Sequence, residues 1–375
     1  LAGLLAALLP AARAANWANG VYIVNNQCSE PADTIDTFAE FTERIDFATD
    51  GNCINTMPSW DVSRVTSFSG MLTDAPSDFN EDLNSWDTSA VTTMTSAFNN
   101  RVSFNQDLDS WNTSSVNEMD RMFHGCTAFN RSLNSWDTSA VTTMESMFYE
   151  ATSFNGDISA WDTSAVISME SMFYDADSFD GDVSAWDTSA VTTMTQMFEK
   201  TALFNGDISS WDTGAVNDMM MMMMSTLSFN VDINAWNVES VTRMNKMFHS
   251  SSFNLDINGW DTHSVNDMFG MFSESDFNQD LIGWNTGAVT DMDYMFYDAT
   301  SFNGDISVWD TGAVKTTSWM FGRTSSFNGD ISQWNTAQVT SMDYMFFLSN
   351  FNEELSEWDT SAVLNMEGVF ESTYK

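Results

Sequence analysis

Apolar residues recur along this chain with a period of about 25 residues. Tryptophan marks the period most clearly, because thirteen tryptophans are spaced by 24 to 26 residues: Trp60, Trp86, Trp111, Trp136, Trp161, Trp186, Trp211, Trp236, Trp260, Trp284, Trp309, Trp334 and Trp358. A valine lies five residues after each of them, and methionine and phenylalanine follow at fixed distances. Such a period indicates a repeat protein, in which each repeat buries its apolar face against its neighbours.

The spacing within one repeat predicts a strand and a helix. Val166, Met169 and Met172 are three residues apart, on one face of a short helix, and the pair 163–164 (Thr-Ser) suits its N-cap. The segment 157–161 (Asp-Ile-Ser-Ala-Trp) is rich in strand formers and predicts a parallel strand. We therefore expect an α/β fold, a right-handed solenoid of about thirteen coils with one short parallel strand and one short helix per coil.

The repeats resemble a known family. The pattern M-x-x-M-F-x-x-A-x-x-F-N-x-D-I-S-x-W-D-T-S-x-V-x-x-M is similar to that of the BspA-like leucine-rich-repeat surface proteins, also known as DUF285, and it covers residues from about 54 to 375. The resemblance implies a leucine-rich-repeat-like solenoid with a role in adhesion and partner binding. It brings no family-wide catalytic residues. This chain departs from the lipoproteins of the family, because no lipobox cysteine follows the first segment.

The sequence divides into three parts. Residues 1–15 read as the remnant of a signal peptide, with an apolar run and an A-x-A box at 12–14, although a buried helix is the alternative. Residues 16–53 form an expected N-terminal cap, with a strand at 21–24 and an amphipathic helix at 34–48. Residues 54–375 form the repeat solenoid, whose last coil shows no obvious cap. No later apolar run reaches the length of a membrane span, so we expect no transmembrane segment.

The chain is strongly acidic. The chain has 53 acidic and 12 basic residues, for a formal net charge of −41. Nucleic acid and anionic membranes are therefore excluded as partners, because both require clustered lysine and arginine. Cys28 and Cys53 precede the regular repeats and are expected to form a disulfide in a secreted protein, whereas Cys126 occupies a small-residue position and is expected to be buried.

Two acidic rows follow from the repeat. The first row comes after the Phe-Asn pair. A low-affinity Ca²⁺ site is one hypothesis for its members Asp157, Asp182, Asp207, Asp232, Asp256, Asp280, Asp305 and Asp330. The other follows each tryptophan, where Asp and Asn interchange. That exchange favours the alternative for both rows, in which the side-chain oxygen accepts backbone N–H groups in a turn. A threonine row follows the second acidic row and is expected to cap helices, with ice binding as the weaker alternative.

No catalytic motif stands out. His124, His249 and His263 fall in different coils, and paired acids occur in every coil, so none is singled out and we expect no enzyme. No cofactor is expected apart from the Ca²⁺ of the acidic row. The sequon at Asn130 is the candidate glycosylation site, whereas Asn112 lies in the second acidic row.

The function expected from these observations is a secreted or cell-surface scaffold for adhesion or for binding an extracellular protein or glycan. Tyr149, Tyr174 and Tyr297 are the expected contact residues. The alternative is a structural subunit of an extracellular filament or coat, in which the chain binds copies of itself by solenoid stacking. A polysaccharide-directed enzyme is a third hypothesis.

Overall fold

The computed structural model describes residues 23–24, 27–28 and 54–373. Strands β1 (Ile23–Val24) and β2 (Gln27–Cys28) form an antiparallel pair in which Ile23 lies opposite Cys28. The 3₁₀ helix η1 (Ile54–Ser59) precedes the repeats. The predicted helix at 34–48 and the signal segment at 1–15 lie outside the described residues.

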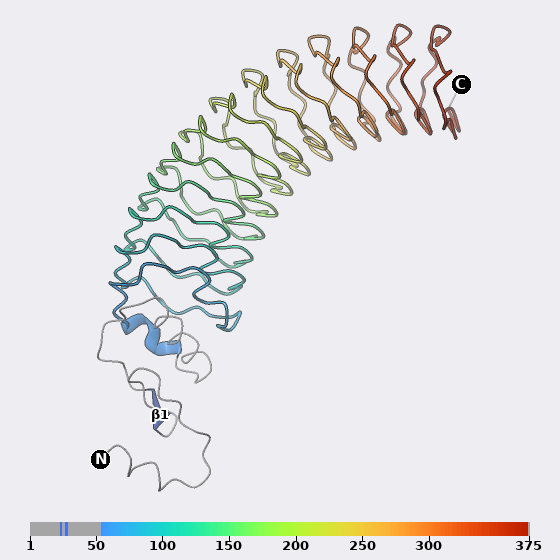
Figure 1. Cartoon of the computed structure of the whole chain (residues 1–375). Coiled ribbons are helices and arrows are strands. Elements are labelled where there is room, and N and C mark those ends of the chain that lie inside the picture. The colour runs from blue at the N-terminus through green and yellow to red at the C-terminus, as the bar shows by residue number, and fades with distance from the viewer. Residues whose placement is uncertain (1–22, 25–26, 29–53, 374–375) are drawn as a thin grey trace.

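From residue 60 the chain winds through successive coils that lie side by side in a curved stack (Figure 1). Isolated parallel bridges join equivalent residues of neighbouring coils at Ser67, Thr93, Glu118, Thr143, Ser168, Thr193, Asp218, Arg243, Asp267, Asp291, Thr316, Ser341 and Asn365. Each bridge links residues 24 to 26 positions apart, which is the repeat period. The stacking of the repeats is therefore direct, one coil upon the next.

The prediction of one strand and one helix per coil is wrong. Within residues 60–373 the structure contains neither an α-helix nor an extended strand. The segment 157–161 makes a turn in which the Trp161 N–H donates to the Ile158 carbonyl at 3.2 Å. The pairing between coils runs instead through the segment predicted as a helix, where the N–H groups of Ser171 and Phe173 donate to the carbonyls of Thr195 and Met197 at 2.8 and 2.9 Å.

Left-handed residues explain the difference. Two positions in nearly every coil have positive φ, such as Ser171 at 53° and Asp175 at 54°. An α-helix needs an unbroken run of right-handed residues, so the left-handed residues Ser171 and Asp175 interrupt it, and alternate N–H groups donate to the next coil instead. We call residues 168–175 and their equivalents the ladder segment, and the surface formed by its outward side chains the ladder face.

The apolar rows form one continuous core. The tryptophans of the 25-residue row from Trp86 to Trp334 are at most 4% exposed, and Trp186 stacks on Trp161 and Trp211 with ring centroids 6.2 and 6.4 Å apart. Each of these indoles also donates its Nε1–H to a carbonyl of the preceding coil, as Trp186 does to Ile158 at 3.3 Å. The expectation that each apolar residue lies over its counterpart is confirmed.

The threonine row has a different role from the one expected. Thr188 is 1% exposed, and its hydroxyl donates to the Asp212 carbonyl of the next coil at 2.8 Å. The same bond recurs at Thr88, Thr113, Thr138, Thr163, Thr213, Thr262, Thr286, Thr311 and Thr336. These hydroxyls join coils and cap no helix. Because the row is buried, it cannot present a flat surface to ice.

Replacing Thr188 with valine should lower the free energy of unfolding by about 1 kcal/mol, because the Asp212 carbonyl loses its buried donor. Valine fits the site, since Val62 and Val238 occupy the same row in other coils and are buried. Chemical denaturation would measure the loss. Thr188→Ser, which keeps the hydroxyl but loses a buried methyl group, is a second comparison, and full stability of Thr188→Val would contradict a stabilising hydrogen bond.

Candidate functional site

Both acidic rows act as turn acceptors. Asp157 Oδ1 accepts the Ser159 N–H, and Asp162 Oδ1 accepts the Ser164 N–H, each at 3.0 Å. Hydrogen bonds from the Ser184 hydroxyl and backbone N–H hold the pKa of Asp182 below its usual value. The second row repeats this bond in every coil, including those with asparagine, such as Asn112. The prediction that the Asp/Asn exchange reflects an acceptor role is confirmed.

The Ca²⁺ hypothesis gains no support from the geometry. The eight carboxylates from Asp157 to Asp330 are all exposed, and each coil contributes one. Among the described residues, no three Asp, Glu, His or Cys side chains come close enough together to hold a metal ion. Because Ca²⁺ takes six or more oxygen ligands, this row would need ligands that the coils do not gather. The site stays a prediction.

An asparagine row was not predicted. The side-chain oxygen of Asn130 accepts the Asn155 N–H at 2.9 Å, while the Asn130 N–H donates to Asn105 at 3.0 Å. The pattern continues from Asn80 to Asn352, with Asp180 taking one place. The recurrence of Asn directly after Phe was the sequence signal for it. Glycosylation of Asn130 stays a prediction, and the side chain is already engaged in this row.

Cys126 belongs to the core, as expected. Its thiol is buried and donates to the Phe98 carbonyl with 3.0 Å between Sγ and oxygen. Burial raises the pKa of this thiol to about 12, so it is protonated at neutral pH and a poor nucleophile. The predicted Cys28–Cys53 disulfide involves Cys53, which lies outside the described residues.

One acid–histidine–serine chain of contacts occurs on the surface. His263 Nδ1 lies 3.0 Å from Asp261 Oδ1, and His263 Nε2 lies 3.1 Å from the Ser264 hydroxyl. The order resembles that of a hydrolytic triad, but such a triad depends on a buried carboxylate that orients the imidazole beside an oxyanion hole. Here the Asp261 and His263 side chains are 62% and 45% exposed. Water therefore solvates both groups, and these contacts provide no basis for catalysis.

Aromatic residues gather on the ladder face. In the described repeats, every Tyr, Trp or Phe that lies outside the core rows is in a ladder segment: Tyr149, Tyr174, Phe269, Tyr294, Tyr297, Trp319, Tyr344 and Phe347. None of them is fully buried. Tyr149 stacks on Tyr174 at 4.3 Å, and Tyr297 contacts Trp319 at 5.7 Å. The structure thus places all three predicted contact residues on one face.

The sequence analysis missed the other five aromatic residues. Trp319 is the one tryptophan in residues 60–373 that falls out of the 25-residue register, which was the available signal. Tyr294 and Tyr344 hold the position of Trp319 in the adjacent coils, so the three rings stack. Residues that are neighbours in space here are 25 apart in sequence, and only the stacking register reveals them.

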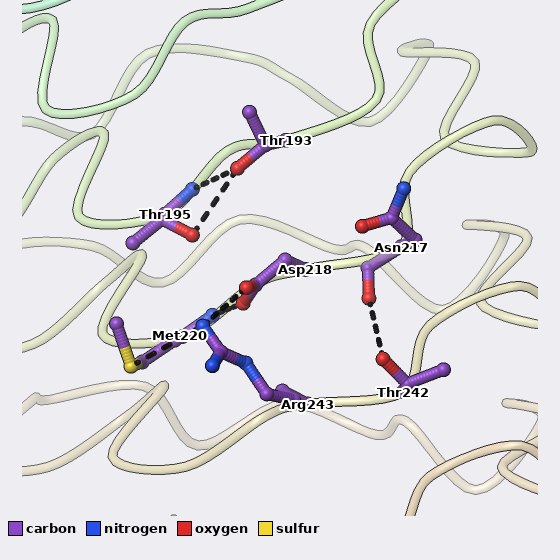
Figure 2. Close-up of polar contacts among 7 residues, drawn as sticks. All are labelled: Thr193, Thr195, Asn217, Asp218, Met220, Thr242 and Arg243. Carbon is purple, nitrogen blue, oxygen red and sulfur yellow. Dashed lines mark hydrogen bonds and ion pairs between the residues drawn. The ribbon is translucent and has the colours of Figure 1, made fainter.

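The middle of the ladder face carries polar and methionine side chains in place of aromatic ones (Figure 2). Arg243 forms an ion pair with Asp218, whose Oδ1 also accepts the Met220 N–H at 3.0 Å. The Thr242 hydroxyl donates to the Asn217 carbonyl at 3.1 Å. In the run 219–224, Met219, Met222 and Met223 are buried while the other three are half-buried on the ladder face. These methionines therefore fill the core and, on the ladder face, separate Tyr149 and Tyr174 from the aromatic residues that begin at Phe269.

The carboxyl group of Asp293, next to Tyr294 in the sequence, has a raised pKa. Burial, reinforced by the charges of Asp291 and Asp343, raises the pKa of Asp293 to about 6, although the Thr316 hydroxyl and the Ser318 N–H donate to it. The folded state therefore holds this proton more tightly than the unfolded chain. Its contribution to stability is largest below pH 3.8 and is lost as the pH rises to about 6.

Asp293→Asn should therefore stabilise the protein at pH 7, by about 1 kcal/mol after allowance for solvent screening. Asparagine keeps an acceptor oxygen for Thr316 and Ser318 but carries no charge. Thermal unfolding at pH 7 and near pH 4 would measure the difference, and the gain should vanish at the lower pH. Equal gains at both pH values would contradict the assigned pKa.

Comparisons with known proteins agree with the repeat pattern. The family model described as "Mycoplasma protein of unknown function, DUF285" matches six overlapping segments: 40–156, 97–205, 128–236, 179–282, 228–318 and 273–375. No curated protein matches this chain. A leucine-rich-repeat protein of Leptospira interrogans is similar at 7% identity over 89% of this chain and 87% of its own, but its TM-score of 0.21 carries no argument.

In the part of the chain that the structure describes, no helix is both long and apolar enough to cross a bilayer. The family matches together extend from residue 40 to residue 375 and so cover the whole tryptophan row. Their overlap reflects the repeat, because one model can align with successive sets of coils. This chain belongs to the DUF285 family of repeat proteins.

Proposed function

We propose that this protein is a secreted or cell-surface scaffold that binds an extracellular partner through the ladder face and catalyses no reaction. One observation carries the proposal: in the described repeats, every Tyr, Trp and Phe outside the core rows lies on that face. Tyr and Trp are enriched among the residues that dominate binding energy at protein interfaces. A regular scaffold that varies its side chains on one face is how repeat proteins present extended binding surfaces.

The rest of the surface does not show this pattern. The ladder face varies its side chains from coil to coil, whereas the acidic rows repeat the same Asp, Asn and Ser in coil after coil. Leu203, Leu227 and Val308 are exposed elsewhere and are aliphatic, and the exposed Phe370 belongs to the core phenylalanine row of the last described coil. Variation of aromatic and charged residues is therefore concentrated where neighbouring coils present a continuous surface. Secretion is the part of the proposal that rests on the apolar segment 1–15.

The test is binding of the purified chain to arrays of immobilised extracellular-matrix proteins and glycans. A variant with Tyr149, Tyr174, Tyr294 and Trp319 changed to glutamine should lose its binding at least tenfold, about 1.4 kcal/mol. The matched control changes Leu203, Leu227 and Val308 to glutamine, which removes exposed apolar surface elsewhere. Equal loss in both variants would indicate non-specific adhesion and contradict the proposal.

Location needs its own measurement. Protease treatment of intact cells that express the full protein should remove the repeats if they are at the cell surface, whereas repeats released into the medium indicate secretion. Protection inside the cell would contradict this part of the proposal. The filament alternative stays a prediction, and electron microscopy of the concentrated protein would decide it.

A further inference from the structure

A pocket opens on the ladder face where one coil lacks a side chain. Gly270, with φ 59°, holds the position that Lys246 occupies in the preceding coil and Tyr294 in the next one. The missing side chain leaves a cavity of about 170 Å³, which is lined by Lys246, His249, Phe269, Gly270, Ser273 and Tyr294. Drug-sized ligands need roughly 300–1,000 Å³, so this pocket suits one small unit of a larger ligand.

Ser273 brings an unused hydroxyl to the pocket. The residue is 4% exposed, and its hydroxyl makes no hydrogen bond with a described residue but is not sealed from solvent. Buried hydroxyls elsewhere in this fold bind a carbonyl, as Ser275 does with Phe272 at 2.7 Å. A buried hydroxyl without a protein partner costs free energy unless a group from outside the chain binds it. Ser273 is therefore available to a ligand.

Lys246 brings an unpaired charge. Arg243 and Arg323 each pair with a carboxylate, whereas Lys246 forms no ion pair or hydrogen bond with a described residue. Its Nζ lies 5.5 Å from the ring centroid of Phe269, which holds the ammonium beside the pocket and leaves its N–H groups free. Burial lowers the pKa of His249, so the neutral imidazole adds no charge to that of Lys246 at pH 7.

The carboxylates beside the pocket are bonded to the chain. Asp267 Oδ1 accepts the Phe269 N–H at 3.0 Å, and Glu274 Oε2 accepts the Ser250 hydroxyl at 3.2 Å. Neither carboxylate is part of the described lining. The formal net charge of −41 repels anions at a distance, but 0.1 M salt screens this repulsion beyond about 10 Å. Within the pocket, a ligand therefore meets an ammonium and hydroxyl groups.

We propose that this pocket binds one carboxylate-bearing sugar unit of an acidic glycan, a proposal that rests on the proposed function of the ladder face and names its ligand class. Lys246 pairs with the carboxylate of the sugar, while Ser273 and Tyr294 bond its hydroxyl groups. The C–H groups of the sugar contact the apolar wall formed by Phe269 and Tyr294. An acidic protein side chain would satisfy Lys246 but leave Ser273 without a partner.

The experiment measures the affinity of the full chain for a galacturonic acid oligosaccharide and a sialic acid oligosaccharide by calorimetry, each beside its methyl ester. At least one acid should bind, and its ester should bind at least tenfold more weakly, because esterification removes the charge. Lys246→Gln should weaken the acid about tenfold and leave the ester unchanged. Ser273→Ala should cost about fivefold, for one lost hydrogen bond. Lys315→Gln, which removes an exposed lysine of another coil, is the matched control and should bind like the wild type.

Gly270→Gln tests the pocket itself, because it adds a side chain and removes no donor. Glutamine is accommodated at this position, since Gln196 holds the equivalent place with φ 56°. A Cβ atom at Gly270 would lie 3.3 Å from Lys246 Cγ, so the new side chain enters the cavity and should weaken the acid at least tenfold. Ser146→Gln adds the same side chain at the equivalent place of another coil, where φ is 52°, and should bind like the wild type. Circular dichroism confirms that both variants are folded.

Several outcomes would overturn the proposal: no binding of either acid, equal affinity for acid and ester, or wild-type binding by Gly270→Gln. A glutamate-rich peptide whose binding depends on both Lys246 and Gly270 would make the ligand a protein and overturn it as well. A partner that still depends on Tyr149 and Tyr174, which lie outside the pocket, would leave the proposed function intact in each case. Failure of that function would appear instead as an array on which no ligand responds to any change of the ladder face.

Discussion

Trp186→Ala is expected to destabilise its region of the stack by about 3–5 kcal/mol, the usual cost of removing a large buried aromatic side chain. Trp186 is 4% exposed and lies between Trp161 and Trp211, so truncation leaves a cavity that both neighbouring rings border. The Ile158 carbonyl, which accepts the Trp186 Nε1–H at 3.3 Å, also loses its donor in a buried site.

The damage should be local, because each coil contacts only its neighbours. Native-state hydrogen exchange should accelerate in the coils from Trp161 to Trp211 and stay unchanged at the far end of the stack. Trp186→Phe is the control, since it keeps an aromatic ring and loses only the indole donor and part of the volume, and its cost should be clearly smaller. Uniformly faster exchange throughout the chain would contradict a stack of locally stabilised coils.

The buried rows could be predicted because burial depends on residue type and repeat position. Every predicted apolar row from tryptophan to methionine is in the core, as Val166 and Met169 show. Their secondary structure could not be predicted in the same way. Apolar residues three apart fit a helix, but they also fit a chain that turns back toward the core after every left-handed residue, and side-chain spacing does not distinguish the two.

In the candidate site, too, only the local features could be predicted from the sequence. The acceptor role of the acidic rows could be predicted because each bond lies within one turn, as between Asp162 and Ser164. The donors of the threonine row act on the next coil, and the ring stacks of Trp319 join three coils, so both depend on a stacking register that local patterns do not contain. Tyr149 and Tyr174 were predicted as contact residues, but their stacking on each other also depends on that register.

Glu150→Val is expected to cost about 2 kcal/mol, because valine disfavours the left-handed conformation that this position requires. Glu150 has φ 54° and is exposed, while its backbone N–H donates to the Tyr174 carbonyl of the next coil at 2.7 Å. In the described residues, no Val, Ile or Thr has a positive φ. The change therefore tests the backbone with little loss of side-chain packing.

Two substitutions that the chain itself uses at this position are the controls. Asn100 and Gly125 hold the equivalent place in the two preceding coils with φ 58° and 69°, so Glu150→Asn and Glu150→Gly should unfold within about 1 kcal/mol of the wild type. Denaturant unfolding followed by circular dichroism would compare the three variants. If valine were tolerated as well as asparagine, the residue would have no need for a left-handed backbone, and a helical ladder segment would again be compatible with the sequence. A large cost for valine alone would instead support the turned ladder, because only the backbone conformation distinguishes these variants at an exposed site.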